Sequence, residues 1–250
     1  MLRRVLSLSG HEARYVLRDP FPYFLLLGMP LVITMFVSPA YKPLLRVQGF
    51  SSANGAEQAV PGMAVMFVFF FVGYIGYSFY EESTWGTWRR LLLTDASLFE
   101  IVVGKASPYV LIVIVQQVLL LIVGQWLFGL DLGGSPLALL ALSTALVLFM
   151  AALSVALVAV TKTYQQVSAF QTIGTLVLAG IGGVITPIGS LPGWARHVAP
   201  TTPTYWAMEG SRRVILEHKG LTGALLPCGV LLLFAAGCAG LTALRLTADR

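Results

Sequence analysis

Long apolar runs constrain this chain more than any other feature. Each of six runs is about as long as the ~20 residues that cross the hydrocarbon core of a bilayer. Only 11% of the residues are charged, whereas soluble domains carry about 25%. A span must satisfy its backbone hydrogen bonds internally, so each run is predicted to be helical. We expect an all-α membrane protein, a single transmembrane domain with six transmembrane helices at about 21–39, 60–80, 106–128, 136–160, 167–188 and 221–244.

The distribution of basic residues predicts the orientation. With the N-terminus inside, ten of the 16 Lys and Arg residues fall in inner segments, which favours cytoplasmic termini. These basic residues occur singly or in pairs at the ends of apolar runs and are not clustered into a continuous basic stretch. The net charge of +5 therefore indicates membrane lipids as partners, and no nucleic acid. We expect a multi-pass protein of a bacterial plasma (inner) membrane.

Three segments outside the spans have their own character: residues 1–20, 81–104 and 189–220. Residues 1–20 mix apolar and basic residues, including Arg14, Arg18 and Asp19, as in a helix lying in the inner interface. Residues 81–104, here called the coupling loop, are densely charged and end in a capping-box pattern at Ser97 and Glu100. Ser135-Pro136 likewise predicts the start of the fourth span.

Residues 189–220 form an outer segment in which Thr202-Pro203 predicts the start of a short helix. Along it, Glu209 and Arg213 stand four residues apart, as do Arg213 and Glu217, so we expect exposed ion pairs there with a structural role.

Several kinds of chemistry are not supported by the residues. His11, His197 and His218 do not have metal-ligand spacing, so no metal site is predicted. The Gly104-Lys105 pair lacks the earlier glycine and the following Ser or Thr of a phosphate-binding loop. The predicted spans carry no ionisable residue in their middle portions, which argues against a proton-coupled carrier. Any energy for transport must then come from a partner, and we predict no enzyme in this chain.

The coupling loop begins with the stretch YEESTWGTWRRLLLTD. Both signs of charge, two tryptophans of the kind enriched at interfaces, and Gly86 for a tight turn make it suitable as a docking surface. A solvated loop whose arginines only fix topology is the alternative that composition leaves open.

Three motifs in this order resemble those of ABC-2 type transporter permeases, the membrane subunits of a class of ATP-binding-cassette exporters. The first is Glu82-x-x-x-Gly86-Thr87 followed by Leu91-Leu92-Leu93, Ser97, Glu100 and Gly104-Lys105. The second is Arg18-Asp19-Pro20, and the third is Leu191-Pro192-x-Trp194 with Pro200, Pro203-Thr204-Tyr205 and Arg212. The resemblance covers nearly the whole chain. One departure is Asp95, where the family often has proline; we expect it to alter the end of the coupling helix.

The resemblance implies that the coupling loop holds a helix that docks on a separate ATP-binding-cassette ATPase subunit. ATP and Mg would be bound by that subunit, with no cofactor in this chain. Residues 1–20 would be the connecting helix beside it, and residues 189–220 would dip into the outer leaflet. The expected coupling residues are Glu82, Trp85, Gly86, Thr87, Trp88, Arg89 and Arg90.

Six spans make half a pathway, so a second permease is expected, as a homodimer or heterodimer. Small residues allow close helix approach, and the predicted dimer face is Gly174, Gly180, Gly182 and Gly183, with packing inside one subunit as the alternative. Polar residues inside spans are the predicted substrate path, although interhelical hydrogen bonding explains them as well. They are Gln116, Gln117, Gln171, Thr172 and Thr175.

The absence of deep charges suggests an amphipathic, drug-like or lipid-like cargo. A polysaccharide or glycolipid exporter is the alternative within transport, and it would need a wide, aromatic-lined groove. A membrane interaction or assembly protein that transports nothing is the alternative from another class.

Overall fold

The computed structural model describes residues 2–87, 90–91, 93–132 and 135–248, and this part of the chain is all-helical, with no strand. The prediction of an all-α fold is therefore confirmed at the level of secondary structure. The α-helices are α1 (Leu2–Arg18), α2 (Phe21–Val47), α3 (Ala56–Thr84), α5 (Leu98–Phe128), α6 (Pro136–Val160), α7 (Tyr164–Ile181), α8 (Gly193–Val198), α9 (Pro203–Ile215) and α10 (Gly220–Ala248). Two short 3-10 helices, Ile188–Ser190 and Ala199–Thr201, flank α8.

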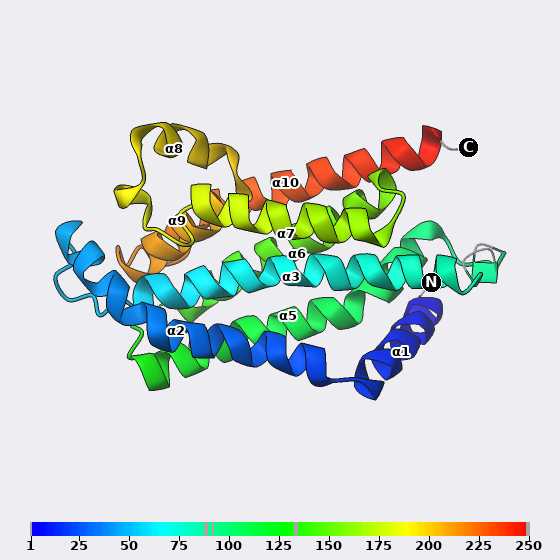
Figure 1. The fold of residues 1–250 in the computed structure, drawn as a ribbon, viewed down its shortest axis with the longest axis horizontal. Helices are drawn as coiled ribbons and strands as arrows, with labels where there is room; N and C mark the ends of the chain where they lie inside the picture. Colours follow the sequence, from blue (N-terminus) through cyan, green and yellow to red (C-terminus); the bar gives the residue numbers. More distant parts are fainter. Residues whose placement is uncertain (1, 88–89, 92, 133–134, 249–250) are drawn as a thin grey trace.

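The long helices form a bundle around α3 (Figure 1). Among the described helices, α2, α3, α5, α6 and α10 are long and apolar enough to cross a membrane. In the most apolar window of α3, 83% of the residues are buried, against 17% in α2 and in α10. α3 contacts α2, α5, α6, α7 and α9. It is thus the central helix, and α2 and α10 turn much of their apolar surface outwards.

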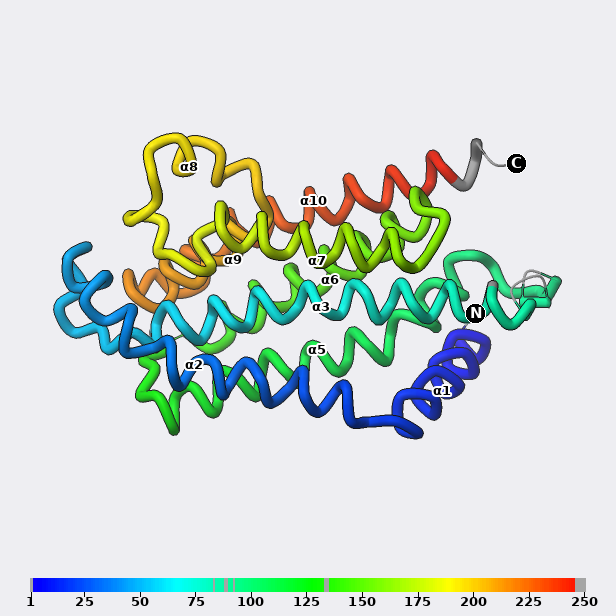
Figure 2. The backbone as a smooth tube through the Cα atoms, viewed as in Figure 1, coloured from blue at the N-terminus to red at the C-terminus, as the bar shows by residue number. Residues whose placement is uncertain are grey.

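The fifth predicted span, 167–188, is the one that is not among these five helices. The corresponding helix α7 ends at Ile181, because Gly182 caps it and Gly183 takes a positive φ of 83°. Its first turns are polar, with Gln165, Gln166 and Gln171. α7 nevertheless lies alongside α3 for most of its length (Figure 2).

Local sequence signals set several helix ends. The capping box at Ser97 is present: its side chain accepts from the Glu100 N–H, and Glu100 accepts from the Ser97 N–H. Ser135 and Thr202 likewise cap α6 and α9 through their side chains. α2 runs on to Val47, past the expected end at Pro39, because proline is tolerated where neighbouring groups compensate for its missing N–H.

The outer segment folds back onto the bundle through α9, which contacts α3, α6, α7 and α10. One expectation for this segment is wrong: the Glu209 side chain is only 7% exposed. It pairs with Arg212 and Arg213, at N–O distances of 2.9 and 2.8 Å. Glu217 pairs with Arg212 and Lys219, not with Arg213 as expected, because α9 ends at Ile215 and the spacing of four no longer applies.

Both described chain ends lie at the end of the bundle where the coupling loop lies, and α1 crosses that end obliquely to the long helices (Figure 1). One face of α1, with Glu12 and Val16, is buried, while Leu2, Leu6 and Leu17 are exposed. This arrangement brings α1 against α5 and places it close to the coupling loop.

Candidate functional site

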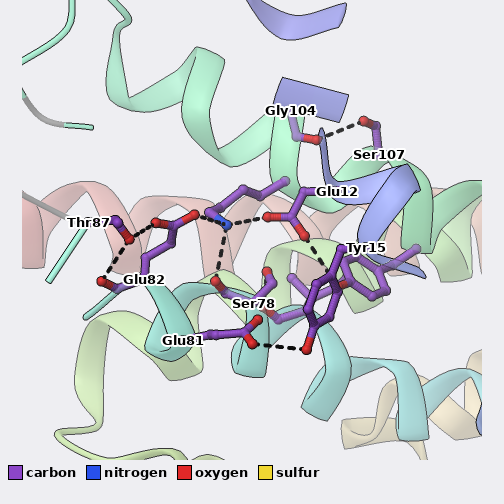
Figure 3. A network of polar contacts seen from close by, with 11 residues as sticks. Glu12, Tyr15, Ser78, Glu81, Glu82, Thr87, Gly104 and Ser107 are labelled. Carbon is purple, nitrogen blue, oxygen red and sulfur yellow. Dashed lines mark hydrogen bonds and ion pairs between the residues drawn. The ribbon is translucent and has the colours of Figure 1, made fainter. Parts of the chain in front are cut away.

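A buried cluster of charges joins α1, α3 and α5 beneath the coupling loop (Figure 3). The Lys105 ammonium of α5 forms ion pairs with the carboxylates of Glu12 on α1 and of Glu82 on α3, the second at 3.1 Å. It also donates to the Ser78 backbone carbonyl at 3.1 Å. The Lys105 side chain is 3% exposed, that of Glu12 8% and that of Glu82 20%. A buried charge requires this degree of pairing.

The last turns of α3 explain why Ser78 and Glu82 both contact Lys105. Ser78 and Glu82 are four residues apart and so lie on one helical face, towards Lys105. Glu82 is also in the C-terminal turn of α3, where the helix dipole disfavours a carboxylate. A cation from another helix offsets that disadvantage, and Lys105 supplies it.

Close packing of α1 on α5 explains the contact between Glu12 and Lys105. A Cβ added to Gly104 would lie 2.6 Å from the Leu8 Cβ, so glycine is needed at this crossing. The hydroxyls of Ser9 and Ser107 are hydrogen-bonded at 2.6 Å. With α1 so close, Glu12 reaches Lys105, and its second oxygen accepts from the Tyr109 hydroxyl at 3.4 Å.

A second carboxylate at the end of α3 has different partners. Glu81 accepts a hydrogen bond from the Tyr15 hydroxyl of α1 at 2.9 Å. Burial and the contact with Glu81 raise the pKa of the Tyr15 phenol, so Tyr15 is a donor at neutral pH. Glu81 thus forms a hydrogen bond to α1, whereas its neighbour Glu82 forms an ion pair with α5.

The expected coupling residues lie at and beyond the end of α3. Gly86 has a φ of +69°, and after it the Thr87 hydroxyl donates to the Glu82 carboxylate and, at 3.2 Å, to the Glu82 carbonyl. Trp85 is 65% exposed, and Arg90 is exposed as well. Trp88 and Arg89 lie outside the described residues. The turn therefore presents Trp85 outwards and is tied inwards through Glu82.

The three residues expected in the interfacial helix, Arg14, Arg18 and Asp19, are exposed. Asp95 is exposed too and pairs with Arg4 of α1 at 3.6 Å. Its backbone carbonyl also accepts from Arg4. The residue that departs from the family pattern thus contacts α1, although an exposed pair of this kind stabilises little.

The predicted substrate-path residues are divided between helices. Gln116 donates to the Leu26 carbonyl of α2 at 3.1 Å. Gln117 donates to the Ala64 carbonyl of α3 at 3.1 Å and accepts from Ser143 of α6. On α7, Thr175 donates to the Gln171 carbonyl within its own helix, and Thr172 is exposed. Gln116 and Gln117 thus join helices, while Thr172 faces the outside of the bundle.

The four glycines of the predicted dimer face also divide into two kinds. A Cβ on Gly182 would lie 1.9 Å from the Thr204 Oγ1, and one on Gly183 would lie 2.4 Å from Ile188. Both positions therefore serve packing within this chain. A Cβ on Gly174 or Gly180 would meet nothing within 4 Å.

Sequence reasoning did not identify Lys105, Glu12 and Ser78 as partners. Lys105 and Glu12 are 93 residues apart, and each stands beside an apolar run, where charge is ordinarily assigned to topology. The described residues contain no group of three His, Cys, Asp or Glu side chains that could hold a metal ion.

Comparison with known proteins identifies a family that this chain matches. The sequence model of the family described as "ABC-2 type transporter" matches residues 4–216, which include the three helices of the charged cluster. This chain belongs to the ABC-2 type transporter family. Its members are membrane permease domains without a nucleotide-binding domain, and they typically pair with an ABC ATPase.

One relative is the linearmycin resistance permease protein LnrN of Bacillus subtilis (strain 168). It is 30% identical over 200 residues, which cover 79% of this chain and 51% of the relative. This ABC-2 chain therefore matches about half the length of that permease.

Proposed function

We propose that this chain is the permease subunit of an ATP-driven exporter and that a separate ATPase subunit docks on its coupling loop. The observation that carries the proposal is that the loop continues directly from the central helix. α3 is the most enclosed of the described spans, and Glu82 to Thr87 follow in its last turn and the turn after it. A push on the exposed Trp85 would therefore act on the helix that contacts most of the bundle.

In this proposal α7 also crosses the membrane, as the fifth of six spans in chain order. Its 18 residues rise about 27 Å, close to the ~30 Å hydrocarbon thickness. Both termini then lie in the cytoplasm with the coupling loop. α7 is more polar than the other long helices and exposes Gln166 and Thr172. Such a helix suits an interface with a second permease and the lining of a transport pathway between the two subunits. Gly174 and Gly180 stay available on that helix for close approach.

We propose an amphipathic, drug-like or lipid-like cargo. A groove of about 550 Å³ between α5, α6 and α10 is lined mainly by aliphatic side chains, with Phe99 as the one aromatic in its described lining. This lining suits an apolar cargo better than a glycan. The resistance function in the name of the relative supports a compound that is toxic to the cell.

Gly86 offers a test of docking. Gly86→Trp is expected to leave the protein in the membrane but to lower stimulated ATP hydrolysis by the copurified complex at least tenfold. The added side chain enters open space at the surface, so it obstructs a partner without a clash inside the chain. Gly86→Ala is the control, because it carries the same strain of about 1–2 kcal/mol at positive φ without the bulk. Wild-type stimulation in the Gly86→Trp complex would contradict docking at this turn.

A further inference from the structure

We infer that Lys105 is a positioning residue that makes the coupling loop and α1 respond to each other, with Glu82 as its releasable partner and Glu12 as its permanent one. The inference rests on the proposed function, because it describes how a docked ATPase would act on the permease. It deepens that proposal by naming the contact that changes.

The ammonium of Lys105 is fully occupied. A lysine has three donor hydrogens, and the structure provides three acceptors, on Glu12, Glu82 and the Ser78 carbonyl. The Phe79 ring lies 5.9 Å from the nitrogen and adds a weak favourable contact. No further acceptor is required at this nitrogen, so a change in the cluster must take the form of losing one of the three.

The two carboxylates are not equivalent. Glu12 is buried on α1 and would be left as an uncompensated charge without Lys105, which is strongly unfavourable. Glu82 is partly exposed and has a second partner in Thr87. When Glu82 leaves, one ammonium and one carboxylate remain buried, and Glu82 reaches water with Thr87. The cluster therefore has two arrangements without an unpaired buried charge, and they differ only in the position of Glu82.

The direction of coupling follows from the contacts. Thr87 belongs to the turn that the ATPase would contact, and it holds one Glu82 oxygen while Lys105 holds the other. A displacement of the turn thus separates Glu82 from Lys105 and removes one of the contacts that hold the end of α3 to α1 and α5. A ligand shifts such an equilibrium only by binding the two states differently, and the ATPase would do so at the turn.

The adjacent residue provides a matched control. Glu81 is on the same helix and also contacts α1, but it accepts from Tyr15 and forms no described contact with Lys105. Glu81→Gln keeps an acceptor oxygen for Tyr15. Glu82→Gln removes the negative charge that makes the contact with Lys105 strong. The two variants differ by one position and separate a loss of charge at this helix end from a loss of the lysine pair.

The test measures the separation between α1 and the end of α3 in the complete complex, copurified from native membranes with its ATPase. Spin labels are placed by Gly10→Cys, where an added Cβ meets nothing within 4 Å, and by Thr84→Cys, which is exposed. The two cysteines of the sequence, Cys228 and Cys238, are replaced by alanine so that only the introduced cysteines carry labels. We expect one short distance without nucleotide and a longer one after trapping with ATP and vanadate.

In the Glu82→Gln complex, the ratio of long to short distances without nucleotide should rise at least tenfold, and in Glu81→Gln it should stay within twofold of the wild type. Lys105→Met should show the same rise. If Lys105→Met does not accumulate, the double variant Lys105→Met with Glu12→Gln removes the orphaned carboxylate and should show it instead.

Two results would overturn the inference but leave the proposed function standing, provided that the wild-type complex still responds to nucleotide. One is a wild-type ratio of long to short distances in Glu82→Gln. The other is an equal change of that ratio in Glu81→Gln and Glu82→Gln. Recovery of the wild-type chain without an ATPase subunit would overturn the proposed function, and the inference with it.

Discussion

Gly182→Ala is expected to destabilise the protein by about 3 kcal/mol, the upper part of the usual range for overpacking a core. The new Cβ would lie 1.9 Å from the Thr204 Oγ1 and 2.6 Å from the Thr204 Cβ. Thr204 is 1% exposed and donates to the Leu178 carbonyl at 2.7 Å, so moving it breaks the hydrogen bond that ties α9 to α7. The measurement is the thermal unfolding midpoint of the purified protein in detergent.

Gly180→Ala is the matched control on the same helix. Its Cβ meets nothing within 4 Å, and alanine is preferred over glycine in a helix by about 1 kcal/mol. The unfolding midpoint of the monomeric chain should therefore stay the same or rise. A fall as large as that of Gly182→Ala would show that the close contact with Thr204 is not what makes Gly182 necessary.

Much of the fold could be predicted because its signals are local. Ser135-Pro136 marks the start of α6, which has the bounds 136–160 that hydropathy alone indicates. Ser97 and Glu100 form the expected capping box. α5 begins at Leu98, where the capping box predicts a helix start. The predicted span 106–128 begins later than this helix because Glu100 and Lys105 interrupt the apolar run, although both are buried in the fold. Hydropathy describes a residue by its type, whereas burial depends on its partners.

The charged cluster could not be predicted for the same reason. Lys105 is separated by 93 residues from Glu12, and its burial depends on a helix crossing that only Gly104 permits. The sequence showed Gly104-Lys105 as part of a family pattern and Glu82 as a coupling residue, but it did not show that these positions meet. The end of α7 was missed because Gly182 and Gly183 fit a membrane span as well as a helix terminus.

The outer segment contains a further buried carboxylate whose loss should be costly. Glu209 accepts from Arg212 at 2.9 and 3.0 Å and from Arg213 at 2.8 Å. Burial alone would raise the pKa of Glu209, but these hydrogen bonds outweigh it and hold the pKa below its ordinary value. One ionised carboxylate thus pairs with two guanidinium groups at the point where α9 packs into the bundle.

Glu209→Gln is expected to cost about 3 kcal/mol, the lower part of the range for a broken buried pair, because the two arginine side chains are 33% and 28% exposed and keep some hydration. Glu217→Gln is the matched control: Glu217 is more exposed, at 22%, and its pairs with Arg212 and Lys219 should contribute at most about 1 kcal/mol. Thermal unfolding of both variants measures the difference. Equal shifts would mean that the arginines do not depend on Glu209 for their charge balance.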